Sequence, residues 1–105
     1  MELKNLPRHY KSLRKKFPDY FAALENLGRE AKATGSLDEK TIELLGLVAA
    51  AATRSEGALH SHARRAVQAG ASREDLYQAL LSVTSTIGFP AVAASISWLE
   101  DVIKQ

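Results

Sequence analysis

The feature that most constrains the fold of this chain is a repeated order of helix start signals, apolar stretches with helical spacing, and helix stop signals. The start signals are Pro7, Pro18, Ser36, Ser72 and Pro90, and the stop signals are Gly35, Gly70 and Gly88. Between them, apolar residues recur three and four positions apart, which is the period of an α-helix. No stretch alternates between apolar and polar residues as a half-buried strand would. The pattern predicts an all-α chain of about six helices.

These helices are expected to cover residues 7–16, 18–34, 38–55, 56–69, 72–87 and 90–104. The segment Ser36–Glu39 has the form of a capping box that opens the third helix, and Ser72–Asp75 has the same form before the fifth. The third helix carries apolar residues on all its sides, so it is predicted to be buried on most faces. Only the extreme termini look loosely ordered.

The length of 105 residues indicates one domain, residues 1–105. A chain this short buries a limited fraction of its surface and often gains stability by forming oligomers. The alanine-rich apolar run at residues 44–53 is too short to span a bilayer, so no membrane partner is expected. The N-terminus lacks the apolar region of a secretion signal. A cytoplasmic protein is the default expectation.

The formal net charge is +2, and the basic excess lies at the start of the chain. Six of the first sixteen residues are basic: Lys4, Arg8, Lys11, Arg14, Lys15 and Lys16. Such a segment can bind nucleic acid or an anionic membrane. A solvated helix face explains it better, because the rest of the chain is nearly neutral. Nucleic acid is therefore not an expected partner.

Cysteine is absent from the sequence. Disulfides, thiolate metal sites and cysteine nucleophiles are thereby excluded. Peroxide reduction by a thiol is excluded as well, because the thiolate is the group that attacks peroxide.

The segment Ser55–Ala71 resembles the signature helix of the carboxymuconolactone decarboxylase and alkylhydroperoxidase-D-like family. Redox members of that family read Cys-x-x-Cys-x-x-x-His, followed by a helix of small residues that ends in Ala-Gly. His62 falls on the family histidine, whereas Ser55 and Ala58 stand at the two cysteine positions. The chain is therefore similar to a family member that keeps the acid–base residue and lacks the thiols.

Two further matches extend the resemblance. Glu43 lies twelve residues before Ser55, where redox members carry the glutamate that relays protons with the histidine. The segment Gly88–Ala91 is similar to the Gly-x-Pro-Ala turn between the last two family helices. The resemblance implies an alkylhydroperoxidase-D-like helical bundle, with the family core at 36–105 after basic N-terminal helices at 1–35. It also implies a homo-oligomer, a trimer or hexamer, with pockets at the subunit contacts.

Two functions are compatible with this resemblance. The first is an enzyme of the decarboxylase or lyase class without a cofactor, which carries out decarboxylation or proton transfer on a small carboxylated substrate. The second is a non-catalytic oligomer that keeps a binding pocket or serves as a partner subunit. A water-accessible cavity lined by both Glu43 and His62 would favour the enzyme, whereas a dry contact between them would favour the structural role.

Glu43 and His62 are the candidate catalytic pair. Glu43 is the one acid in an apolar run, so it needs a partner or access to solvent. It could instead lie on an exposed edge or pair with Arg29 or Lys40. Counted from Ser55, Glu43 and His62 lie about 18 and 10 Å along their helix axes, so a straight hairpin would not align them. Contact would need displaced or crossed helices, or a neighbouring subunit.

Arg64, His60 and Ser55 are the candidate substrate-binding residues, and Arg54 and Arg65 could also hold an anion. Ser55 lacks a visible activating base and is better explained as a helix cap. His60 and His62 face opposite sides of a helix, about 200° apart, so they cannot bind one metal. Glu56 shares a face with His60, but a solvated pair at a helix start explains it better. No metal site is expected.

Overall fold

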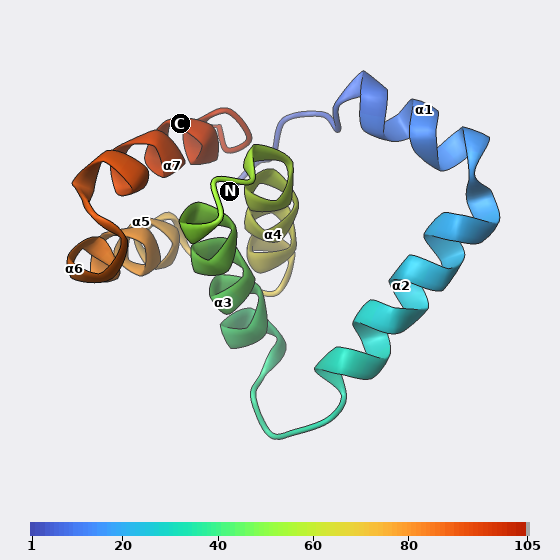
Figure 1. Ribbon diagram of the computed structural model, residues 1–105, viewed down its shortest axis with the longest axis horizontal. Coiled ribbons are helices and arrows are strands. Elements are labelled where there is room, and N and C mark those ends of the chain that lie inside the picture. Colours follow the sequence, from blue (N-terminus) through green and yellow to red (C-terminus); the bar gives the residue numbers. More distant parts are fainter. Residues whose placement is uncertain (105) are drawn as a thin grey trace. The chain divides into compact units, whose positions relative to one another are not determined.

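The computed structural model describes residues 1–104, which form seven helices and no sheet (Figure 1). The helices are α1 (Arg8–Lys16), α2 (Pro18–Lys32), α3 (Glu39–Ala52), α4 (Glu56–Gln68), α5 (Arg73–Ser82), α6 (Thr84–Ile87) and α7 (Phe89–Glu100). The all-α prediction is confirmed. The chain divides into two compact units: a core unit of residues 1–4 and 37–105, and a helical arm of residues 5–36.

In the core unit, α3 packs along α4, α4 also packs against α7, and α5 contacts both α3 and α7 (Figure 1). The buried side chains at the centre come from all four helices, and the largest aliphatic ones are Leu47, Leu59, Leu76, Leu80 and Leu99. Alanines on α3 and α4 are also fully or nearly fully buried. Small residues let two helices approach closely, which places polar groups on α3 within reach of α4.

The helical arm is made of α1 and α2, which meet at Phe17. Phe17 precedes Pro18 and leaves helical geometry, as the residue before a proline does. Across the bend, Arg14 pairs with Glu25, and the rings of Tyr10 and Phe21 meet edge to face at 5.8 Å. Neither helix contains a buried residue.

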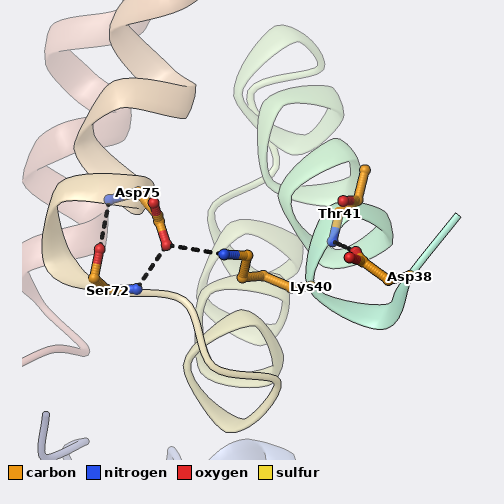
Figure 2. Close-up of polar contacts among 5 residues, drawn as sticks. All are labelled: Asp38, Lys40, Thr41, Ser72 and Asp75. Atoms are coloured by element: carbon orange, nitrogen blue, oxygen red, sulfur yellow. Dashed lines mark hydrogen bonds and ion pairs between the residues drawn. The ribbon is translucent and has the colours of Figure 1, made fainter.

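The capping box expected at Ser72 is present, whereas the one expected at Ser36 is not. Ser72 Oγ accepts from the Asp75 N–H, and Asp75 Oδ2 accepts from the Ser72 N–H at 3.0 Å (Figure 2). At α3 the cap is Asp38, whose Oδ1 accepts from the Thr41 N–H at 2.7 Å. Asp38 directly precedes the first residue of α3, so its carboxylate can accept a hydrogen bond from the N–H of the third helical residue, Thr41. Lys40 also reaches Asp75 Oδ2 at 3.4 Å, which joins the starts of α3 and α5.

The helix predicted at 72–87 is wrong as a single element, because it breaks at Val83 into α5 and α6. The hydroxyls of Ser82 and Thr84 donate to the carbonyls of Ala79 and Leu81, both at 2.7 Å. Such side-chain bonds compete with the backbone ladder and loosen it. The helix predicted at 90–104 ends at Glu100, and α3 ends at Ala52 rather than at residue 55.

Residues 2–4 and 102–104 pair with each other, contrary to the expectation of loose termini; Gln105 lies outside the described residues. Leu3 and Ile103 form an isolated antiparallel bridge. The Lys4 N–H donates to the Val102 carbonyl and the Lys104 N–H donates to the Glu2 carbonyl, each at 3.0 Å. Ile103 is fully buried, which explains why the chain leaves the helix to bring it inward. None of the helices in the described chain has the length and apolar character that a bilayer crossing requires.

Candidate functional site

Glu43 on α3 and His62 on α4 meet inside one chain. Glu43 Oε1 lies 2.9 Å from His62 Nδ1, and Glu43 is only 1% exposed. The His62 side chain keeps 27% of its surface exposed. The predicted contact between Glu43 and His62 is therefore confirmed. Lys40 pairs with Asp75.

The straight-hairpin estimate was wrong because α3 ends at Ala52 and α4 begins at Glu56, so neither helix reaches residue 55. From Glu43 to the end of α3 is nine residues, and from the start of α4 to His62 is six. These spans correspond to about 13.5 and 9 Å along the axes. The remaining offset of about 4.5 Å is within the reach of a glutamate and a histidine side chain.

Gly46 provides the space for this contact. A Cβ built at Gly46 would lie within 2.7 Å of three His62 ring atoms, Nδ1, Cε1 and Cγ. The imidazole therefore lies directly on the α3 backbone, one helical turn after Glu43. No other residue type could occupy position 46 without displacing the ring.

Arg65 completes the polar cluster around the carboxylate. Its Nε lies 3.8 Å from Glu43 Oε1, while its Nη2 donates to Ser61 Oγ at 2.8 Å. The Arg65 side chain is 42% exposed. A buried carboxylate is costly unless it is paired and hydrogen-bonded, and here an imidazole and a guanidinium both approach it.

The cluster has the parts that general acid–base catalysis requires. A carboxylate that accepts a hydrogen bond from Nδ1–H holds the imidazole in one tautomer and stabilises its protonated form. The ring lies with Nδ1, Cε1 and Cγ nearest to Gly46 of α3, and the side chain keeps 27% of its surface exposed. An arginine beside the pair can bind a carboxylate ligand.

The structure places Arg64 and Ser55 elsewhere. Arg64 is 8% exposed, and its guanidinium donates to the Lys4 carbonyl, which ties the N-terminal segment to α4. Burial lowers the pKa of Arg64 from its usual value. Ser55 occupies the N-cap position of α4, but its hydroxyl makes no capping bond; its N–H donates to the Ala50 carbonyl at 2.9 Å. Their roles in substrate binding stay predictions.

His60 lies apart from His62, on the side of α4 that faces the end of α7. His60 Nε2 is 3.9 Å from Asp101 Oδ2, and Glu56 lies one turn before it. The opposed directions predicted for the two histidines are confirmed by these different partners.

An open hollow of about 290 Å³ lies between α3 and α5. Its lining residues are Leu44, Asp75, Gln78, Ala79 and Ser82. Glu43 and His62 do not belong to this lining, so the hollow is not the water-accessible cavity that would have identified the pair as catalytic. The pair meets instead in a close contact in which Glu43 is buried and the His62 side chain is 27% exposed.

The fold and this site define a small helical protein with a glutamate–histidine pair held between two adjacent helices. The chain belongs to the carboxymuconolactone decarboxylase family, whose sequence model matches residues 18–101. None of the curated proteins matches this chain.

Two proteins of known structure show the same fold. A carboxymuconolactone decarboxylase family protein from Legionella pneumophila is 28% identical, with a TM-score of 0.70 over 88% of this chain and 82% of that one. A Thermotoga maritima protein is 33% identical, with a TM-score of 0.64 over 87% of this chain and 86% of that one. A second crystal structure of this Thermotoga maritima protein names it as a member of the carboxymuconolactone decarboxylase family. A role in the antioxidative response has been suggested for that protein.

The sequence did not reveal the roles of three site residues, Arg65, Gly46 and Asp101. Arg65 was noted as an anion binder but not as a neighbour of Glu43. Gly46 was not singled out, although a glycine three residues after a lone buried acid shares its helix face and indicates a close approach. Asp101 had no signal at all, because it meets His60 only through the packing of α7 on α4.

Proposed function

We propose that this protein carries out proton transfer or decarboxylation on a small carboxylated substrate, with Glu43 and His62 as its acid–base pair. The observation that carries the proposal is the bond of 2.9 Å between a fully buried carboxylate and a partly exposed imidazole. Glu43 lies on the side of α3 where Gly46 makes room for the imidazole. Its carboxylate orients Nδ1 of His62, which leaves Nε2 to act as the acid or base.

In this mechanism His62 Nδ1–H donates to Glu43, and Nε2 exchanges the proton with the substrate. In a decarboxylation the bond between carbon and the carboxylate breaks, CO2 leaves, and the electron pair remains on carbon. Nε2–H of the imidazolium then protonates that carbon, and the ring regains a proton from solvent. The Glu43 charge stabilises the imidazolium while it carries the proton.

Arg65 is the group we assign to the substrate carboxylate. Its guanidinium is held by Ser61, and the Arg65 side chain as a whole is 42% exposed. A planar guanidinium can bind a carboxylate through two parallel hydrogen bonds, which would fix the substrate beside His62.

The experiment uses a carboxylated muconolactone as the probe and measures CO2 release and the exchange of carbon-bound hydrogen with D2O. Glu43→Gln and His62→Gln should each lower the rate by about 100-fold or more, because general acid–base catalysis contributes on this order. Arg65→Gln should raise KM more than it lowers kcat.

Glu39→Gln on α3 and His9→Gln on α1 are the matched controls, because each changes the same residue type at an exposed position. Both should keep the wild-type rate. Absence of CO2 release and of hydrogen exchange in the wild-type chain would contradict the enzyme and favour the second function. Equal losses in the control variants would contradict the assignment of Glu43 and His62 as the acid–base pair.

The second function, a non-catalytic oligomer with a binding or partner role, is favoured by the apolar surface of α2. Tyr20, Leu24 and Leu27 are exposed by 64, 49 and 65%, although they lie on one side of that helix. We infer that this side packs against a second copy of the chain, in a homo-oligomer that the family resemblance makes a trimer or hexamer. Helices without a buried residue gain stability mainly from packing on another surface.

A further inference from the structure

Three potential ligand atoms from two distant parts of the chain converge at one end of α4. Glu56 and His60 lie one turn apart on α4, and Asp101 follows the end of α7. One imidazole nitrogen and one oxygen of each carboxylate all lie within 4.8 Å of one another. His60 Nε2 faces Asp101, 41 positions later in the sequence, so tertiary packing brings the three together.

His60 Nε2 is buried and lacks a hydrogen-bond partner. Its neighbour Asp101 Oδ2 is 3.9 Å away, too far for a hydrogen bond. A buried polar nitrogen without a partner loses its hydration without compensation, which is rare in native proteins. The position therefore calls for a further group between the imidazole and the carboxylates.

A metal ion fits this spacing. Zinc binds histidine nitrogen and carboxylate oxygen at about 2.0–2.2 Å, so two ligands of a tetrahedral ion lie roughly 3.4 Å apart. The observed 3.9 Å between nitrogen and oxygen is close to that separation. Glu56 is exposed and the Asp101 side chain is 60% exposed, so both carboxylates can close the remaining gap by rotation.

We propose that Glu56, His60 and Asp101 form a binding site for a divalent transition metal ion of the zinc class. Imidazole with carboxylate is a donor set that suits zinc and its neighbours better than calcium or magnesium. Three protein ligands leave one coordination position to water. The ion joins the first turn of α4 to the end of α7 and satisfies His60 Nε2.

This site is separate from the acid–base pair. His60 and His62 project from α4 about 200° apart, and their partners lie on α7 and α3 respectively. The inference therefore does not depend on the proposed function. Sequence reasoning favoured a solvated pair for Glu56 and His60, because the third ligand is not visible without the fold.

The test is calorimetric titration of the full-length protein with ZnCl2, supported by the visible absorption of the cobalt(II) form. Wild-type protein should bind one ion per chain. His60→Gln, Glu56→Gln and Asp101→Asn should each weaken binding at least about tenfold, because even changes outside the ligand shell commonly cost that much. Glu56 and Asp101 are exposed, so their variants should fold even if the histidine variant does not.

His9→Gln and Glu74→Gln are the matched controls, since both residues are exposed and lie outside the cluster. Both should bind zinc as the wild type does, and at the same zinc concentration the melting temperature of these controls should rise more than that of Glu56→Gln. The proposal is overturned if wild-type protein does not bind zinc, if Glu56→Gln and Asp101→Asn bind it unchanged, or if His62→Gln is the only variant that abolishes binding.

Discussion

Glu43 is an acid in the interior of an apolar helix, and its partners explain how it is tolerated there. At 1% exposure its charge has lost nearly all contact with water, so its stability rests on His62 and the other groups around it. Replacing one member of such a pair leaves the charge of the other buried without a partner. Replacing both members costs less free energy of unfolding.

A double-mutant cycle at Glu43 and His62 should therefore reveal strong coupling. We expect Glu43→Gln and His62→Gln to destabilise the protein separately, and the double variant to be more stable than the sum of both losses predicts. The coupling energy should be about 1–3 kcal/mol, measured by urea unfolding at neutral pH. Additive losses would show that the two side chains act independently.

Gly46 is the residue on which this contact depends. Gly46→Ala should lower the free energy of unfolding by about 1–3 kcal/mol, because the new methyl group must displace the His62 ring. Gly57→Ala on α4 is the matched control, since nothing lies within 4 Å of its Cβ. The control should be neutral or stabilising by up to about 1 kcal/mol. A stable Gly46→Ala protein with an intact Glu43–His62 contact would contradict the packing described above.

At the scale of the helices, the turn between α3 and α4 contains a strained residue. Arg54 has a φ of +57°, the one positive value at a non-glycine position among residues 1–104. This conformation costs about 1 kcal/mol for a residue with a Cβ, whereas glycine adopts it freely.

Arg54→Gly should accordingly raise the free energy of unfolding by about 0.5–1 kcal/mol, measured by urea denaturation. The opposite change serves as the control: Gly70, after α4, has a φ of +103°, so Gly70→Ala should destabilise the protein. A lower free energy of unfolding for Arg54→Gly than for the wild type would contradict the strain assigned to Arg54.

The capping box at the start of α5 makes the stability of the protein depend on pH. The hydrogen bond from the Ser72 N–H lowers the pKa of Asp75 below its usual value, and Lys40 adds to the effect. A carboxyl group with a lowered pKa in the folded state stabilises the fold above its unfolded pKa of about 3.8. That stability is lost as the pH falls through the folded pKa.

Asp75→Asn should therefore destabilise the protein at neutral pH, and its difference from the wild type should shrink as the pH falls below about 3.8. Urea unfolding at pH 7 and at pH 3 measures the two differences. Ser72→Ala removes the other half of the capping box and should cost about 1 kcal/mol at neutral pH. A difference for Asp75→Asn that is equal at both pH values would exclude the carboxylate charge as its cause.

For the whole molecule, the apolar side of α2 is the feature that its own unit, residues 5–36, does not cover. We expect the protein to sediment at a multiple of its chain mass of 11.4 kDa at micromolar concentration. A Leu24→Glu/Leu27→Glu variant should shift it towards the mass of one chain, because a charge is costly in an apolar interface. Asn26→Glu, on another side of α2, adds a charge without changing the apolar stripe and should leave the mass unchanged. Wild-type protein at the mass of one chain would contradict the oligomer.

Most of the fold could be predicted from the residues themselves. Helical spacing and the glycine and proline signals located six elements, because those signals depend only on local backbone geometry. The break at Val83 was missed because hydroxyl groups at Ser82 and Thr84 compete with the backbone in a way that spacing does not show. The paired ends were missed because Leu3 and Ile103 are a hundred residues apart.

The sequence by itself determined the fold class, the family, the absence of thiol chemistry, and the identity of Glu43 and His62 as candidates. Only the tertiary structure decided that these two side chains touch within one chain, and that His60 faces Asp101. The physical reason is that helix formation depends on neighbours a few residues away, whereas a site depends on how helices cross. That crossing is set by the packing of small residues such as Gly46, whose effect appears only when a second helix lies against them.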